Sequence, residues 1–185
     1  MASFSKKTEL IIGKDSYRRN FSRVYFNNGF LYVSNCHCLL KQKLSLFGFS
    51  EDQVDKLNGN SINIHDWSMI RKFKDHCPVD GGIDCVTKTS KVFYKFKNEE
   101  FEDQKTVESM EKVIQTHQKL ENDVDSTFDL NVSLLNDLNE AMFLSADHLV
   151  FKTTGAKNAI IVFSEGSEFS IEDQIGLIMP VNIRN

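Results

Sequence analysis

The 185-residue chain has only two prolines, one tryptophan and no long apolar run. With so little proline, the chain has no Pro-rich linker that would divide it. No stretch approaches the 18 or so consecutive apolar residues that a membrane-spanning helix needs. Residues 1–7 are polar and lack the apolar segment of a secretory signal peptide. We therefore expect a soluble, cytoplasmic protein that does not enter a membrane.

Cysteine is also sparse, with four residues at 36, 38, 77 and 85. Without an export signal, reduced thiols are expected rather than disulfides. The cysteine pairs of structural zinc sites are usually separated by two to four residues. One residue between Cys36 and Cys38 is too few, and seven residues between Cys77 and Cys85 are too many. We predict no metal and no cofactor.

Catalytic motifs are missing as well. The sequence contains no Gly-rich phosphate loop, His-Glu-x-x-His or Gly-x-Ser-x-Gly. Cys36 and His37 are neighbours on an expected strand, so their side chains point to opposite faces and cannot form a nucleophile and base pair. The sequence predicts a protein that is not an enzyme; a thiol enzyme based on Cys36 and Cys38 is the alternative.

Charge is unevenly distributed. Residues 1–98 carry 16 Lys and Arg against 9 Asp and Glu, whereas residues 99–185 carry 6 against 17. The basic part could face a polyanion. Alternatively, the two parts neutralise each other where they meet, within one chain or between protomers.

The first part of the sequence indicates strands. Asn28-Gly29 separates two β-prone runs, a strong hairpin signal. Residues 39–46 alternate, with Lys41 and Lys43 on an outer, basic face. Residues 8–12 are expected to form a strand, Ser50 to cap a helix, and residues 83–89 and 92–97 to form a second hairpin. A further helix should begin at Asp66 and end at Cys77-Pro78.

The second part indicates a connecting helix at residues 102–121 and a helix at 131–143. Strands are expected at 128–130, 149–152, 159–163 and 175–183. Together these elements predict an α+β fold of antiparallel sheets with helices packed on one face, built from repeated β-α-β-β units. We expect the chain to divide into an N-terminal segment at residues 1–100, a helical connector at 101–121 and a C-terminal segment at 122–185.

Two stretches resemble the sliding clamp family, the beta subunit of bacterial DNA polymerase III. Residues 14–40, which end Ser34-Asn-Cys-His-Cys-Leu39-Leu40, are similar to the family segment that ends Thr-Asp-Gly-His-Arg-Leu. Phe128-Asp-Leu-Asn-Val-Ser-Leu-Leu-Asn-Asp-Leu138 and Ile175-Gly-Leu-Ile-Met-Pro-Val181 look like its last helix entry and its closing Met-Pro strand. Here the family's Gly and Arg are replaced by Cys36 and Cys38. The resemblance spans about one and a half of the family's three domains.

The resemblance implies a DNA-clamp fold and an apolar cleft that receives a short linear peptide of a polymerase, clamp loader or other replication or repair protein. The residues at the matching positions are Ser34, Cys36, His37, Cys38, Leu39, Val107, Leu177, Met179 and Pro180. At Val107 the match could instead shift towards Val113. Ordinary packing in a sheet is the alternative role for these residues.

The resemblance also implies non-specific contacts with DNA phosphates. The candidate basic residues are Arg18, Arg19, Lys41, Lys43, Arg71 and Lys72, with Lys91, Lys95 and Lys97 as further basic positions. Against this, the 131–143 helix exposes Asp137 and Glu140. The expected function is that of a non-enzymatic, sliding-clamp-like protein, either as a homo-oligomer around DNA or as an adaptor or inhibitor that binds a protein partner without encircling DNA.

Overall fold

The computed structural model describes residues 2–13, 19–98, 100–123, 129–144, 149–164 and 169–180. Ten strands and four α-helices are assigned within these ranges. The strands are β1 (Arg23–Asn27), β2 (Phe30–Ser34), β3 (Cys38–Lys43), β4 (Asn60–Asn63), β5 (Asp75–Val79), β6 (Gly82–Val86), β7 (Lys91–Lys95), β8 (Val150–Lys152), β9 (Ile160–Phe163) and β10 (Gln174–Ile178). The helices are α1 (Glu51–Leu57), α2 (Ile64–Ile70), α3 (Glu100–Gln118) and α4 (Val132–Ala141), with three 3-10 turns, η1 (Thr8–Leu10), η2 (Arg19–Phe21) and η3 (Leu44–Phe47).

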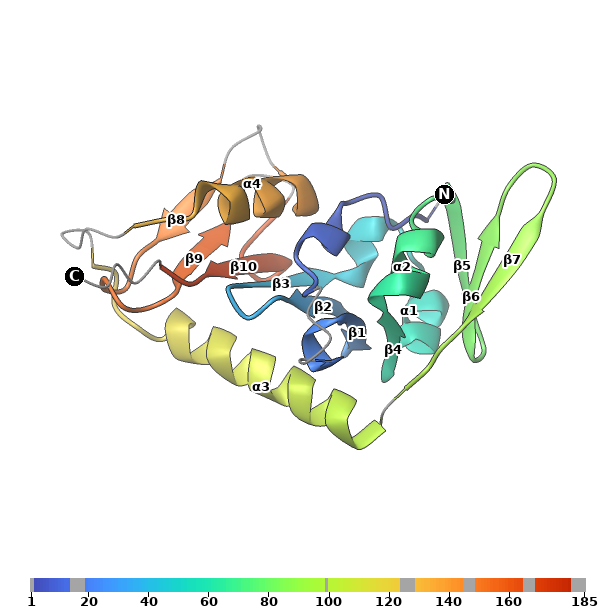
Figure 1. Cartoon of the computed structure of the whole chain (residues 1–185), viewed down its shortest axis with the longest axis horizontal. Helices are drawn as coiled ribbons and strands as arrows, with labels where there is room; N and C mark the ends of the chain where they lie inside the picture. Colours follow the sequence, from blue (N-terminus) through green and yellow to red (C-terminus); the bar gives the residue numbers. More distant parts are fainter. Residues whose placement is uncertain are drawn as a thin grey trace.

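The strands form two antiparallel sheets, which confirms the predicted fold class. The larger sheet has the order β4-β1-β2-β3-β10-β9-β8, and the smaller has the order β5-β6-β7. A helical segment followed by three consecutive neighbouring strands occurs three times, as η1 with β1–β3, α2 with β5–β7 and α4 with β8–β10. The segment β4-α2-β5-β6 has the predicted β-α-β-β order, and β7 adds a further strand. The pairing of β3 with β10 joins the N-terminal and C-terminal parts of the chain in one sheet (Figure 1).

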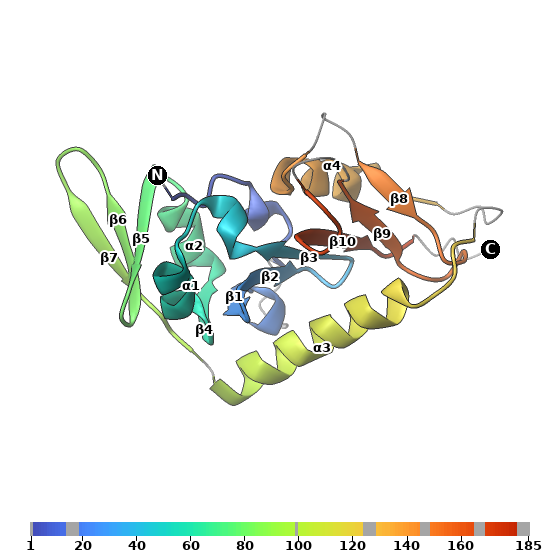
Figure 2. The same cartoon turned by 180° about the vertical axis from the view of Figure 1, so that it is seen from behind.

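Helices cover both faces of the larger sheet. α2 and α4 lie on one side and α3 crosses the other, as both views show (Figures 1 and 2). Side chains alternate between these faces, because neighbouring residues of a strand point in opposite directions. Val24 and Phe26 of β1 pack towards α2, whereas Tyr25 packs towards α3. The α3 layer goes beyond the expectation that helices cover one face only.

An aromatic cluster fixes the N-terminal segment and uses several of the chain's 15 phenylalanines. The Phe4 ring lies 4.7 Å from both the Trp67 and the Phe49 ring centroids, and 5.2 Å from that of His76. The Trp67 indole also donates a hydrogen bond to the Thr8 hydroxyl at 3.1 Å. This cluster packs the first residues against α2 and the larger sheet.

Local signals in the sequence explain several elements. Asn28 and Gly29 both have positive φ in the β1–β2 turn, as the hairpin signal requires. Ser50 and Gln53 form a capping box at the start of α1, which confirms the predicted N-cap.

Other local predictions are wrong. Residues 8–10 form the 3-10 turn η1 rather than a strand, because Thr8 is held by Trp67 and the segment packs on α4. Asn63, not Asp66, caps α2 by accepting from the Asp66 amide. Cys77 and Pro78 lie inside β5 rather than at a helix end. The predicted 128–130 strand falls partly outside the described residues, and Asp129 and Leu130 are not in a strand.

Candidate functional site

The β2–β3 turn forms one wall of a groove. Asn35 accepts hydrogen bonds from the amides of His37 at 3.0 Å and Cys38 at 2.7 Å. The Ser34 hydroxyl donates to the Cys38 carbonyl at 2.8 Å and accepts from the Cys36 amide at 3.2 Å. These bonds hold Cys36 in a left-handed conformation, with φ of 73°. A non-glycine residue is disfavoured there by about 1 kcal/mol, and the sequence resemblance described above places a glycine at this position.

The end of β10 lies directly beside this turn. Leu177 pairs with Leu39 and Ile178 with Cys38 across the two strands. The Met179 amide then donates to the His37 carbonyl at 2.8 Å. Segments separated by about 140 residues in sequence are therefore joined by a continuous antiparallel ladder.

Helix α3 forms the opposite wall. Val107, Met110 and Ile114 are buried against Tyr25, Tyr32, Leu39, Ile175 and Leu177 of the sheet. Two carboxylates of α3 add polar contacts to this packing. The Glu111 carboxylate pairs with Lys41 at 2.6 Å and accepts a hydrogen bond from the Tyr32 hydroxyl. The Asp103 carboxylate lies 3.5 Å from the Arg23 guanidinium. Burial, with Glu111 beside it, raises the pKa of Tyr32 well above its usual value. The helix is thus fixed to the sheet along its length.

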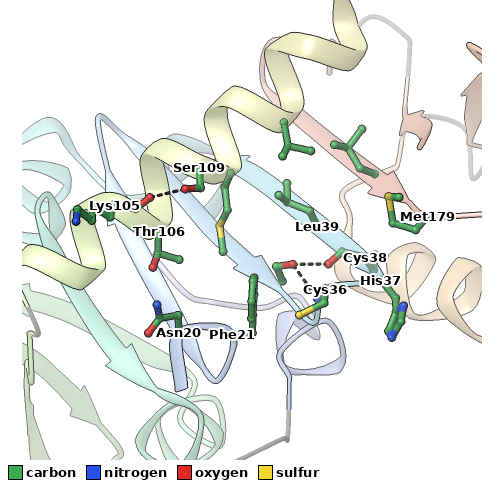
Figure 3. Close-up of a pocket in the computed structure, with 14 residues that line it drawn as sticks. Asn20, Phe21, Cys36, His37, Cys38, Leu39, Lys105, Thr106, Ser109 and Met179 are labelled. Carbon is green, nitrogen blue, oxygen red and sulfur yellow. Dashed lines mark hydrogen bonds between the residues drawn. The ribbon is translucent and has the colours of Figure 1, made fainter. Parts of the chain in front are cut away.

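Between these walls lies a mostly apolar cavity of about 520 Å3. In Figure 3, Lys105, Thr106 and Ser109 lie on the α3 side, Cys36 and His37 on the turn, Cys38 at the start of β3 and Met179 just after β10. The lining residues are Asn20, Phe21, Ser34, Cys36, His37, Cys38, Leu39, Lys105, Thr106, Ser109, Met110, Val113, Leu177 and Met179. We refer to this cavity as the α3 groove. Its volume is within the usual range for ligand pockets.

Seven of the nine candidate peptide-binding residues line the α3 groove: Ser34, Cys36, His37, Cys38, Leu39, Leu177 and Met179. Val107 is buried between α3 and the sheet and lines a different cavity, whereas Val113, one helical turn and a half further along, lines the groove. Pro180 follows Met179 but is not a lining residue. Six lining residues were not predicted from the sequence: Asn20, Phe21, Lys105, Thr106, Ser109 and Met110. The helical spacing of Val107, Met110, Val113 and Ile114 gave a signal for an apolar face but not for what it covers.

The candidate DNA-binding residues do not gather on one surface. Lys41 is beneath α3, with its side chain 18% exposed, so the predicted basic outer face of β3 is wrong at this residue. Arg71 is on the other side of the sheet, where it pairs with Glu9 at 2.8 Å and donates to the carbonyls of Phe4 and Lys6. Lys43 pairs with Asp173 at 3.4 Å, and Arg19 and Lys72 are exposed. Arg18 lies outside the described residues.

Ion pairs join the basic and acidic parts of the chain. Arg23, Lys41, Lys43 and Lys7 pair with Asp103, Glu111, Asp173 and Glu140, respectively. Each pair connects a residue before position 99 with one after it. Part of the charge asymmetry is therefore neutralised within a single chain.

The four cysteines are free thiols. Burial, followed by the nearby Asp137 charge, raises the pKa of Cys38 well above its usual value, and burial with Asp84 raises the pKa of Cys85 to about 12. Both thiols are thus poorly suited to act as thiolate nucleophiles. Within the described ranges no group of three or more His, Cys, Asp or Glu side chains could hold a metal ion, and no helix is long and apolar enough to cross a bilayer.

Comparison with known proteins gives similarity at the level of fold. No protein-family model and no curated protein matches the chain. The solved sliding clamp of Borrelia burgdorferi, DNA polymerase III subunit beta in complex with a natural product, matches with a TM-score of 0.62 and 12% identity over 98% of this chain and 61% of that one. The Bartonella birtlesii clamp bound to griselimycin matches with a TM-score of 0.58 and 13% identity over 95% and 62%.

The Bacillus subtilis sliding clamp also matches, with a TM-score of 0.54 and 10% identity over 98% of this chain and 61% of that chain. The chain therefore has the fold of the sliding clamps, as its sequence resemblance predicts, and it spans about three fifths of the length of these proteins.

Proposed function

We propose that this protein is a non-enzymatic, sliding-clamp-like protein that binds a short linear peptide of a replication or repair protein in the α3 groove. The observation that carries the proposal is the groove itself, in which the β2–β3 turn and the end of β10 lie against α3. A groove of this kind suits a peptide with a few apolar side chains, since preformed apolar pockets supply most of the affinity in such complexes. Two of the clamps similar in fold are solved with a natural product or griselimycin bound. This function would place the protein in the cytoplasm.

Met179 is the most informative residue for a test. Its side chain is 41% exposed at the groove, so its removal costs binding contacts without opening the core. Leu177 lines the same groove but is only 3% exposed, and its truncation would destabilise the fold by about 2–5 kcal/mol. Met179→Ala therefore separates binding from folding, whereas Leu177→Ala does not.

The experiment is a fluorescence anisotropy titration with a labelled clamp-binding peptide. We expect saturable binding, weakened about tenfold by Met179→Ala, which corresponds to losing part of one apolar side-chain contact. Val113→Ala, on the α3 wall, should weaken binding as well. The matched control is Val132→Ala, because Val132 is 74% exposed at the start of α4 and does not line the groove. Absence of saturable binding, or equal affinities for Met179→Ala and Val132→Ala, would exclude the groove as the peptide site.

A second candidate function is that of an adaptor or inhibitor that binds a protein partner without encircling DNA. It is favoured by the charge of the helices on the α2 and α4 side of the sheet. α1 exposes Glu51, Asp52 and Asp55 against one lysine, Lys56, and α4 exposes Glu140, paired with Lys7. The exposed Lys72, which follows α2, is a basic residue on this side that such a function leaves unused. A surface that contacts phosphate should carry unpaired basic residues instead.

DNA retention distinguishes the two functions. A homo-oligomeric ring would remain on closed circular DNA and leave it after linearisation, and it would sediment as an oligomer. An adaptor would sediment as a monomer and show no dependence on DNA topology. Charge reversal at Arg19 and Lys72, which are exposed, would reduce retention in the first case only.

A further inference from the structure

Strand β7 forms a free edge of the smaller sheet. Within the described residues β7 pairs with β6 alone, and β5 is on the far side of β6. Figures 1 and 2 show the β6–β7 hairpin at the end of the molecule that is remote from β8. Edge strands present unpaired backbone groups, which can accept another strand.

The register identifies which backbone groups of β7 face outward. The Phe96 amide donates to the Gly81 carbonyl, and the Thr87 amide donates to the Ser90 carbonyl, in the same register as the pairing of Ile83 with Tyr94. In an antiparallel ladder, hydrogen-bonded and non-bonded pairs alternate. Residues 92 and 94 therefore bond to β6, and the amides and carbonyls of Lys91, Phe93 and Lys95 point to the free edge.

The side chains of the same three residues share the outer face of the sheet, since they alternate with the inward-facing Tyr94. Phe93 is 51% exposed. Its ring lies over Gly82, where a Cβ atom would come within 2.5 Å of the ring. Lys91 and Lys95 are exposed on either side, and Lys91 pairs with Asp84 at 2.6 Å. The edge thus combines an apolar centre with basic flanks.

We infer that β7 accepts an extended acidic segment of another protein as a fourth, antiparallel strand. Residues opposite Lys91, Phe93 and Lys95 would lie on the same face as these side chains. The segment that fits therefore has five residues, with an acidic residue at the first and fifth positions, an aromatic or aliphatic residue at the third, and any residue at the second and fourth. Opposite charges directly across a strand pair are stabilising, and like charges are destabilising.

The charge pattern argues against a second copy of this chain as the occupant. Two β7 strands paired antiparallel about Phe93 would place Lys91 opposite Lys95 in both copies. The other edge strands of the described residues are β4, β5 and β8. β4 and β8 contain no acidic residue, and β5 contains one, Asp75. None of these strands therefore supplies two carboxylates, one for each lysine.

The test uses a labelled peptide with the core Glu-Thr-Phe-Thr-Glu and the whole protein. We expect saturable binding that weakens as salt rises, and no binding of the variant peptide with Lys in place of Glu. Lys95→Pro removes both the charge and an outward amide, and proline is tolerated at such an edge position. Lys95→Thr removes the charge and keeps the amide. Binding should fall at least tenfold for Lys95→Pro and only severalfold for Lys95→Thr, while Met179→Ala should have no effect.

Equal affinities for Lys95→Pro and Lys95→Thr, or no saturable binding, would overturn the inference. If Lys95→Pro loses its native circular dichroism spectrum, amide exchange of the unmodified protein decides instead. The peptide should then slow exchange at Lys91, Phe93 and Lys95, and unchanged rates would overturn the proposal. Self-association of the unmodified protein that Lys95→Pro abolishes would show a second copy at this edge, which also contradicts the inference.

Discussion

Asp103 is the residue whose removal tests most directly how α3 is held on the sheet. One of its carboxylate oxygens lies 3.5 Å from Arg23 Nε, and the other accepts from the Ser61 hydroxyl at 2.6 Å. The Arg23 and Asp103 side chains are only 8% and 11% exposed. Asp103→Ala would leave the Arg23 guanidinium buried without this counter-charge.

Breaking one partner of a buried ion pair costs about 3–5 kcal/mol. Because both side chains retain slight solvent contact, we expect the lower value, about 3 kcal/mol. With a urea m-value of about 2 kcal/mol/M for a chain of this size, the unfolding midpoint should fall by about 1.5 M. Asp103→Asn, which keeps an acceptor for Ser61, should lose less.

The assay is urea unfolding followed by tryptophan fluorescence, since the chain has a single, fully buried tryptophan, Trp67. Glu108→Ala is the matched control, because Glu108 is an exposed acidic residue of the same helix that contacts Gln104. Its effect should stay below about 0.5 kcal/mol. Equal midpoints for Asp103→Ala and Glu108→Ala would refute the view that the Arg23–Asp103 pair holds α3.

Three further predictions concern single groups. His76 is buried, its Nδ1 accepts from the Phe4 amide at 3.2 Å, and burial lowers its pKa. The stability that neutral His76 contributes should therefore be fully present above about pH 6.5 and be lost as the pH falls towards the lower folded-state pKa. If the urea midpoints of His76→Phe and of the unmodified protein have the same pH dependence below 6.5, this prediction is contradicted. Cys36→Gly should raise the unfolding free energy by about 0.5–1 kcal/mol, because glycine adopts φ of 73° without a penalty; thermal unfolding that shows a loss instead would disprove it. Burial, with Glu111 beside it, raises the pKa of Tyr32, so its neutral form favours the folded state and stability should fall as the pH rises above about 10. In an alkaline absorbance titration, the folded protein should ionise the same number of tyrosines as Tyr32→Phe, and one additional tyrosine ionising before unfolding would count against this.

Much of the fold could be predicted because its signals are local. Asn28-Gly29 supplies positive φ at a hairpin turn, Ser50 and Gln53 satisfy the first amides of α1, and apolar residues at helical spacing mark α3 and α4. None of these features depends on distant contacts. The errors have the opposite character: residues 8–10 resemble a strand by composition, but Trp67 and α4 hold them in a 3-10 turn.

The candidate site divides in the same way. The sequence by itself determined which residues carry the likeness to sliding clamps, since the order of the motifs around Ser34–Leu39 and Leu177–Pro180 is a property of the chain. Only the tertiary structure decided that these segments pair through β3 and β10, that α3 closes the groove above them, and that Lys41 and Arg71 are on opposite sides of the sheet. The physical reason is that strand partners and helix docking depend on apolar burial between residues far apart in sequence, and alternation along one strand does not show what will cover either face.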